Sequence, residues 1–330
     1  MSALAARVRL TLDERGLLRG ATRVLVACSG GPDSQVLLHV LASLRDRHGC
    51  ELVAAGVDHG LRPEAPEELN FAARLAAQLG LPFVSLRVVV PVGASLQAQA
   101  REARYAALLQ CAREQGAQRV AVGHTMDDQA ETVLARLLRG AGLEGLQGVV
   151  PRRADGVVRP LIDVRRRDVQ RYAAEQQLAF AEDPSNRDER YLRVRVRRAL
   201  LPQLEVENPR LTEHLAALAD DVRDVSQLIA VDVERAQIAL TRGGPDAGHG
   251  SDGESREETR YVRRSALKLL VEQKTGTAIQ RTHLIALERM LKEGGQVRLP
   301  GDVVASVGTG GQVCFSRVEK RGRGVTRPTE

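Results

Sequence analysis

The feature that most constrains the fold is a glycine-rich turn between an apolar run and an amphipathic segment near the N-terminus. The turn reads Ser29-Gly30-Gly31-Pro32-Asp33-Ser34 and follows the apolar residues 24–28. After the turn, apolar side chains recur at helical spacing over residues 36–44. A strand that enters a helix through such a turn directs backbone N–H groups and the helix dipole toward a bound anion. The sequence therefore predicts a phosphate site on a strand–turn–helix unit.

This turn differs from the Walker phosphate loop, because no lysine follows its second glycine. The first lysine of the chain is Lys268. A phosphate at the turn must therefore be held by backbone amides, hydroxyls, arginines or a metal ion. Gly, Pro, Ser and Asp are also common in ordinary turns, so the motif needs support from other parts of the chain.

The alternation of strand and helix continues over the first 140 residues. Apolar runs predict strands over 23–28, 51–58, 82–90 and 119–123. Helical periodicity predicts helices over 3–18, 34–47, 66–79, 96–115 and 127–139. Such a pattern is typical of an α/β fold with a doubly wound parallel sheet covered on both faces. Ligands bind such sheets past the carboxyl ends of the strands, which here means the loops 29–34, 58–65 and 123–128.

The pattern changes to helices at about residue 160. Helices are predicted over 164–177, 190–205 and 209–240, and again over 260–273 and 278–293, with strands between 296 and 318. The expected domains are a catalytic domain (1–160), an Arg-rich helical extension (161–241), a Gly-rich linker (242–258) and a small α+β C-terminal domain (259–330).

Charge and composition limit the class of partner. The net charge is +6, and residues 151–200 hold thirteen Arg against eight Asp and Glu. An excess of Arg suits phosphate contacts, although a solvated helical face is the commoner reason for such a run. The chain has no Trp and 2% aromatic residues, which argues against base-stacking platforms as the main binding mode.

The cysteines and the hydropathy indicate the compartment. The four cysteines are far apart and form no Cys-x-x-Cys pair, so neither a zinc ribbon nor a local redox pair is expected. No apolar run reaches the length of a membrane span, and the N-terminus lacks the apolar core of a signal peptide. We therefore expect a cytoplasmic protein without membrane contact.

A second polar group follows the fourth expected strand. The stretch 124–132 begins with His124 and carries Asp127, Asp128 and Glu131 into a helix. Asp128 and Glu131 are three residues apart and share one helix face. Paired carboxylates at this edge can bind an ammonium group or a Mg²⁺ ion that carries phosphates. The alternative is that they cap the helix start.

A third group, Val57-Asp58-His59-Gly60-Leu61-Arg62, lies at the end of the second expected strand. By itself it fits an Asp-capped loop with a structural histidine. Its place at the same sheet edge as the glycine-rich turn also suits contact with a nucleotide.

Together the three groups resemble the motifs of the PP-loop family, enzymes that cleave ATP between the α and β phosphates to adenylate a substrate. Within that family, 57–62 and 124–132 are similar to the signatures of the tRNA(Ile)-lysidine synthases, and the stretches 183–186 and 191–197 agree. The detailed resemblance covers about the first two-thirds of the chain. The family usually has Asn where this chain has Val194, which puts one polar contact near the Arg row in doubt.

The resemblance implies a Rossmann-like catalytic domain and a two-step ligation. ATP, with Mg²⁺, adenylates the position-two oxygen of the wobble cytidine in the CAU anticodon of an isoleucine tRNA. The ε-amino group of free L-lysine then displaces AMP and forms lysidine. The oligomeric state stays open, with a homodimer as one alternative.

The resemblance also implies roles for particular residues. The expected ATP-binding residues are Ser29, Gly30, Gly31, Pro32, Asp33, Ser34, Asp58 and His59, and Asp33 is also the expected Mg²⁺ ligand. The expected catalytic residues are Asp33, Arg104, His124, Asp128 and Glu131. Asp128 and Glu131 would hold the cationic lysine, a carboxylate or His124 would take its proton, and Arg104 would face phosphate or base.

The Arg row is assigned to RNA. Arg193, Arg195 and Arg197 alternate in sequence and do not all share one helix face, so one is expected at the active site and the others on tRNA. The C-terminal domain is also expected to contact tRNA.

Two other functions are weighed against this one. A PP-loop tRNA thiolase would share the adenylation step and deliver sulfur to cytidine or uridine, but such chemistry relies on reactive cysteines that no motif here supplies. A nucleotide-binding sensor without chemistry would leave the acidic group and the Arg excess without a role.

Overall fold

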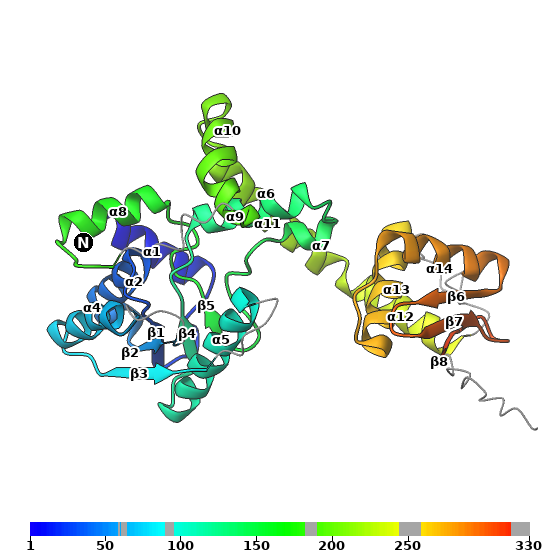
Figure 1. The fold of residues 1–330 in the computed structure, drawn as a ribbon, viewed down its shortest axis with the longest axis horizontal. Helices are drawn as coiled ribbons and strands as arrows, with labels where there is room; N and C mark the ends of the chain where they lie inside the picture. The colour runs from blue at the N-terminus through cyan, green and yellow to red at the C-terminus, as the bar shows by residue number, and fades with distance from the viewer. Residues whose placement is uncertain (59, 61–64, 90–95, 182–189, 244–258, 318–330) are drawn as a thin grey trace, which may run out of the picture. The chain divides into compact units, whose positions relative to one another are not determined.

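The computed structural model describes residues 1–58, 60, 65–89, 96–181, 190–243 and 259–317 (Figure 1). The chain separates into two compact units, Met1–Arg223 and Asp224–Glu330, and each is described by itself. The sequence analysis placed a boundary at residue 241, whereas the contacts divide the chain within the helix Leu211–Leu228.

A five-stranded sheet forms the centre of the first unit (Figure 1). Its order is β3-β2-β1-β4-β5, and all four pairings are parallel. The strands are β1 (Arg23–Ala27), β2 (Glu51–Asp58), β3 (Phe83–Arg87), β4 (Arg119–Ala121) and β5 (Val157–Val158). The doubly wound parallel sheet expected from the sequence is confirmed. The sequence analysis missed β5, because a strand of two residues has no periodicity to detect.

Helices cover both faces of this sheet, as the side chains of β1 demonstrate. Val24 and Val26 lie in one core with residues of α1, α2, α4 and α8, whereas Leu25 lies in a second core with residues of α5. These helices are α1 (Ala3–Glu14), α2 (Pro32–Ser43), α4 (Ala65–Gln78), α5 (Leu96–Glu114) and α8 (Arg166–Glu175). The helix predicted over 34–47 is interrupted at Leu44, after which α3 (Arg45–His48) begins.

The other helices of the first unit pack against α6 (Met126–Leu138). They are α7 (Leu143–Leu146), α9 (Leu192–Arg195), a π-helical turn (Val196–Leu200), α10 (Leu201–Glu207) and α11 (Leu211–Leu228). Ala130 and Val133 of α6 share a core with Val196 and Leu215. This packing brings the Arg row onto the acidic side of α6. The helix predicted over 190–205 is therefore present in three consecutive pieces, with one π-helical turn.

The second unit combines helices with a small antiparallel sheet, as the sequence predicted. Its elements are α12 (Ala230–Arg242), α13 (Arg260–Thr275), α14 (Arg281–Glu293), β6 (Gln296–Leu299), β7 (Val303–Val307) and β8 (Val313–Arg317). Leu267, Leu287 and Ala305, all fully buried, join the helices to the sheet. The single helix predicted over 209–240 is two helices, because the helical pattern stops at Ile229 between α11 and α12.

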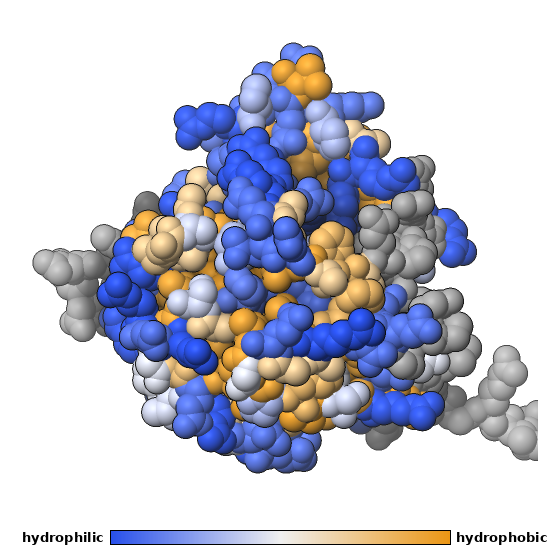
Figure 2. All heavy atoms as spheres, turned by 90° about the vertical axis from the view of Figure 1, so that its left-hand side faces the viewer, coloured by the Kyte–Doolittle hydropathy of each residue, from blue (hydrophilic) through white to orange (hydrophobic). Residues whose placement is uncertain are grey.

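Polar and apolar residues both reach the surface of the molecule. On the face in Figure 2, hydrophilic residues are interspersed with smaller apolar areas. Among the described residues, no helix combines the length and apolar character needed to cross a membrane.

Candidate active site

The candidate site lies where the strand order reverses, between β1 and β4, which is where open parallel sheets bind ligands. The loops that follow these two strands touch each other. A Cβ atom on Gly123, just after β4, would lie 3.1 Å from the backbone carbonyl of Asp33. Glycine at this position therefore lets the second loop approach the start of α2.

The glycine-rich turn is built for close backbone approach. Gly30 has φ +83°, and a Cβ atom there would overlap the backbone carbonyl of Glu68. Gly31 is the N-cap of α2 and Pro32 occupies its first turn, as its fixed φ favours. Within the described part of the chain, the amides of Gly30 and Gly31 donate no hydrogen bond. These N–H groups and the helix N-terminus are therefore available to an anion.

The serines of the turn hold its shape. The hydroxyl of Ser34 accepts from the backbone N–H of Ser29 (3.1 Å) and donates to the carbonyl of Gly31 (2.9 Å). The Ser29 hydroxyl in turn donates to Ser34 Oγ (3.3 Å). Both serine hydroxyls thus take part in hydrogen bonds within the turn.

Asp33 lies in the first turn of α2, and the surroundings of its carboxyl group disfavour the ionised form. Burial raises its pKa to about 7, Asp128 adds to the rise, and Arg166 and Arg197 oppose it. The Asp33 Oδ1 atom is buried and has no hydrogen-bond partner among the described residues. A free carboxylate oxygen of this kind is a ligand that Mg²⁺ accepts together with phosphate oxygens. The residue present therefore fits the expected ion, although the described residues hold no cluster of three or more metal-ligating side chains.

The acidic pair of α6 is buried at the same edge. Asp128 uses one carboxylate oxygen to cap α6, because its Oδ2 accepts from the backbone N–H of Thr125 (2.9 Å) and from its hydroxyl (3.0 Å). Glu131 is fully buried. The capping alternative is therefore correct for one oxygen of Asp128, Oδ2. The other oxygen, Oδ1, and both oxygens of Glu131 remain for other partners.

Three arginines bind those remaining oxygens. Asp128 Oδ1 accepts from Arg166 (3.0 Å), Arg193 (2.8 Å) and Arg197 (3.2 Å). The Glu131 carboxylate accepts from the same three guanidinium groups, at 2.7 Å from Arg197 Nε, 2.8 Å from Arg166 and 3.2 Å from Arg193. Burial alone would raise the pKa of Asp128, but Arg166 and Arg193 outweigh it and hold that pKa well below its usual range. Asp128 is thus ionised at neutral pH.

The network differs in one respect from what the sequence analysis expected of the Arg row. Two of its members, Arg193 and Arg197, lie at the acidic pair, where the sequence analysis expected one. They are four residues apart, so consecutive helical turns place them on one face. Arg195 instead donates to the backbone oxygen of Arg190 (2.9 Å).

The sequence analysis missed Arg166 and Arg165 at the start of α8. Arg166 also donates its backbone N–H to Asp127 Oδ2 (2.6 Å), and Asp128 and Glu131 raise its pKa although burial opposes this. Arg165 binds Glu205 and Glu213, both at 2.8 Å. Arginines in the first turn oppose the helix dipole, and that unfavourable placement was the available signal of a carboxylate partner.

His124 and Arg104 lie in a cationic cluster beside the acidic pair. Three guanidinium carbons, those of Arg101, Arg104 and Arg153, lie 5.1–5.7 Å from the ring centre of Tyr105. His124 Nε2 is 3.5 Å from Arg101, and its buried Nδ1 has no partner among the described residues. Burial lowers the pKa of His124 to about 3, so the ring is neutral and a weak base. This disfavours His124 as the group that takes a proton from lysine.

The remaining expected residues are only partly described. Asp58, at the end of β2, accepts from the backbone N–H of Gly60 (2.8 Å), as in an Asp-capped loop. His59 and the stretch 183–186 lie outside the described residues. The four cysteines are unpaired; Cys28, Cys50 and Cys111 are buried and Cys314 is exposed.

Comparisons with known proteins agree with this geometry. The PP-loop domain family matches residues 3–204. The chain is 40% identical over 292 residues to a tRNA(Ile)-lysidine synthase of Thermobifida fusca, covering 86% of this chain and 89% of the relative. It is 35% identical over 333 residues to that of Geobacter sulfurreducens, covering 96% and 70%.

Other relatives are longer or more distant. A tRNA(Ile)-lysidine synthase of Solibacter usitatus is 41% identical over 230 residues, and the match spans 51% of its length, so this chain corresponds to about half of that relative. Among solved structures, the U34-tRNA thiolase NcsA of Methanococcus maripaludis with its [4Fe-4S] cluster is similar in fold. Its TM-score is 0.58 at 19% identity, over 66% of this chain and 78% of that one.

Proposed function

This chain belongs to the PP-loop family and, within it, to the tRNA(Ile)-lysidine synthases, and on that premise we propose that it ligates free L-lysine to an isoleucine tRNA at the expense of ATP. The acceptor is the position-two carbon of the wobble cytidine in a CAU anticodon, and the products are lysidine, AMP and pyrophosphate. The observation that carries the proposal is the buried Asp128–Glu131 pair at the sheet edge that also holds the glycine-rich turn.

In the first step, the cytidine oxygen attacks the α-phosphate of ATP and pyrophosphate leaves. We expect phosphate oxygens to bind at the N-terminus of α2 and at the amides of Gly30 and Gly31, which donate no hydrogen bond within the described part of the chain. Asp33 would hold Mg²⁺, which neutralises charge on the phosphates when it is bound. Adenylation converts a poor leaving oxygen into AMP, a good leaving group.

In the second step, the lysine ε-amine attacks the position-two carbon and AMP leaves. Asp128 and Glu131 attract the ammonium form of lysine to the site. Because three guanidinium groups already occupy both carboxylates, lysine has to displace at least one of them. Arg193 is the most exposed of the three, with 40% of its side chain accessible against 20% for Arg166, and is the group we expect to yield.

The amine must lose its proton before it attacks. A carboxylate of the acidic pair is the acceptor we propose, because the same pair attracts the ammonium group and therefore lies next to the proton that must leave.

Incorporation of labelled lysine into an isoleucine tRNA transcript with a CAU anticodon tests this function. We expect ATP-dependent incorporation that survives mild base, because an ordinary aminoacyl ester would be hydrolysed. A transcript with a GAU anticodon is the matched control and should incorporate nothing.

Release of AMP that depends on tRNA, without incorporation of lysine, would refute the ligation while keeping the adenylation. Sulfur transfer would then be tested first. The burial of Cys28, whose pKa burial raises to about 12, argues against that thiol as a sulfur carrier.

A further inference from the structure

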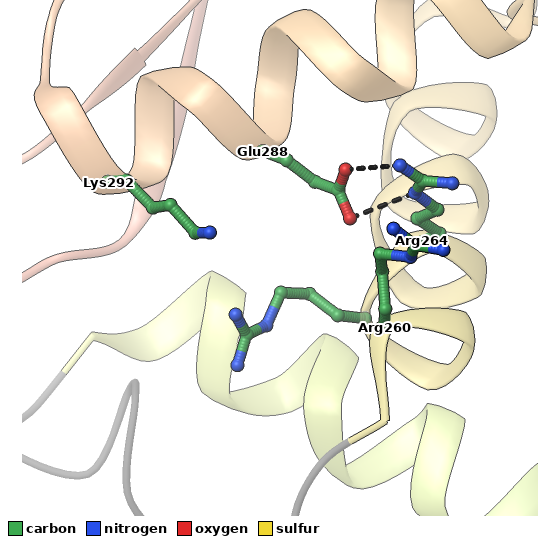
Figure 3. Close-up of a pocket in the computed structure, with 5 residues that line it drawn as sticks. Arg260, Arg264, Glu288 and Lys292 are labelled. Carbon is green, nitrogen blue, oxygen red and sulfur yellow. Dashed lines mark hydrogen bonds and ion pairs between the residues drawn. The ribbon is translucent and has the colours of Figure 1, made fainter.

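A basic pocket lies in the second unit, between α13 and α14 (Figure 3). Arg260, Arg263 and Arg264 line it from the first turns of α13, and Glu288 and Lys292 line it from α14. Four cationic side chains thus meet one carboxylate. A cation that has no carboxylate partner stays hydrated or binds an anion, because removing an unpaired charge from water is costly.

The carboxylate that lines the pocket, Glu288, already pairs with Arg264. Glu288 accepts two hydrogen bonds from Arg264, from Nε to Oε1 (2.9 Å) and from Nη2 to Oε2 (2.6 Å). Both side chains are largely buried, at 19% and 16% exposure. A two-pronged bond of this kind has a fixed geometry, so it ties α13 to α14 at the wall of the pocket.

Arg260 and Lys292 are the lining cations that remain on either side of this bond. Figure 3 shows the side chains of Arg260 and Lys292 extending from the two helices into the same space. Within the described part of the chain, neither forms an ion pair. Their charges are therefore available to a ligand, and their separate origins allow them to hold one anion from two sides.

The surroundings strengthen the positive field. Residues 259–317 contain ten Lys and Arg against four Asp and Glu. Thr259 caps the start of α13, where the helix dipole also favours negative charge. The sequence analysis looked for RNA contacts mainly in residues 151–200, and this second region exceeds it in charge imbalance.

We propose that this pocket binds a backbone phosphate of the tRNA substrate, with Arg260 and Lys292 as its direct contacts and the Arg264–Glu288 bond as the fixed wall between them. The proposal rests on the proposed function for the identity of the RNA. It assigns to these residues affinity and positioning, because phosphate contacts carry no sequence information by themselves.

The test compares two double variants of the full chain. Arg260→Gln with Lys292→Gln removes two charges from the pocket. Arg289→Gln with Arg298→Gln removes two exposed charges of the same unit that pair with Glu293 and Asp302 outside the pocket. Filter binding of the CAU isoleucine tRNA transcript is measured at several salt concentrations, and the KM for ATP is measured in parallel.

We expect the pocket variant to bind tRNA about tenfold more weakly, with a salt dependence of log Kd lower by about one to two, since each lost phosphate contact removes about one unit. The control should stay within about twofold of the wild type, and the KM for ATP should not change in either variant. Equal weakening in both variants, or unchanged tRNA binding in the pocket variant, would overturn the proposal. A raised KM for ATP with normal tRNA binding would also overturn it.

Binding and chemistry are read separately, so the two proposals fail separately. If the wild type makes no lysidine but the pocket variant alone loses tRNA affinity, the ligation falls and the phosphate site stands. If the wild type makes lysidine and the pocket variant binds tRNA normally, the site falls and the ligation stands.

Discussion

Arginine meets carboxylate in both units of the molecule, but the charge balance differs. In the first unit, Asp128 and Glu131 are buried and share three guanidinium groups. In the second unit, one carboxylate stands among four cations in an open pocket. A buried charge needs nearly complete pairing because its desolvation is costly, whereas a hydrated cation is stable without a partner and can bind an anion later. This difference fits our two proposals, a site for small groups in the first unit and a site for a polyanion in the second.

Loss of the Asp33 carboxylate should have the largest effect on the first region. Asp33→Asn is expected to lower the rate of tRNA-dependent pyrophosphate release by roughly 10³-fold, since it removes the carboxyl group proposed to hold Mg²⁺ at the phosphates. A release rate within tenfold of the wild type would remove Asp33 from the machinery.

The same variant should gain stability at high pH. The pKa of Asp33 is raised to about 7 in the folded state, so the folded state binds the carboxyl proton more tightly than the unfolded state does. The stability that this bound proton contributes is therefore lost as pH rises through about 7. Asn stays neutral, so its melting temperature should exceed that of the wild type at pH 8 and differ less at pH 5. A gap of the same size at pH 5 and pH 8 would show that the carboxyl is already ionised at pH 5 and that its pKa is not raised.

Removing the buried charge of Glu131 should have the next largest effect. Glu131→Gln leaves three guanidinium groups around a single charged carboxylate, and we expect the KM for lysine to rise by roughly 10²-fold while that for ATP changes little. Glu213→Gln is the matched control, since Glu213 also pairs with an arginine of this unit. If both KM values rise together, Glu131 acts through the fold alone. Thermal melts in parallel identify a variant that does not fold.

Arg166 should act as a positioning residue for the same pair. Arg166→Gln is expected to raise the KM for lysine by about tenfold, because each carboxylate loses one of the donors that fix its orientation. Arg166→Lys should restore part of the lysine affinity, since lysine keeps the positive charge but lacks the planar guanidinium group that bonds two carboxylates at once. Arg171→Gln, which alters an exposed residue of the same helix, should have no effect. A full rescue by Lys would mean that charge alone matters.

The same change, Glu to Gln, should act in the opposite direction in the second region. Glu288→Gln removes the one carboxylate among the described residues that line the basic pocket, and it should tighten tRNA binding by about twofold, as one further cation becomes available to phosphate. Filter binding measures this effect. Weaker binding would instead show that the Arg264–Glu288 bond holds the pocket in shape, and would reduce the contrast between the two regions.

Much of the first unit could be predicted from the sequence because its signals are local. Continuous apolar strands and helical periodicity located β1 to β4 and most of the helices that cover them. The breaks at Leu44 and Ile229 and the strand β5 were not predicted, since interruptions of one or two residues leave the periodicity almost unchanged.

In the candidate site too, the residues with local sequence signals were predicted and those without such signals were not. The turn 29–34 and the acidic pair were found because strand ends and helix starts mark them in the sequence. Arg166, 35 residues from Glu131, could not be assigned to it, because nothing local links the two. The Arg row was located, but the number of its members at the site was decided by how α9 and the π-helical turn pack on α6.

The sequence by itself determined the alternating sheet, the glycine-rich turn and the family, because these depend on residue order and on backbone conformation within a few residues. Only the tertiary structure decided how charges are paired. The three guanidinium groups on Asp128 and Glu131 come from segments that are distant in the chain, and the bond of Glu288 to Arg264 joins two helices. Burial and distance set the strength of such pairs, and both arise only when the elements pack.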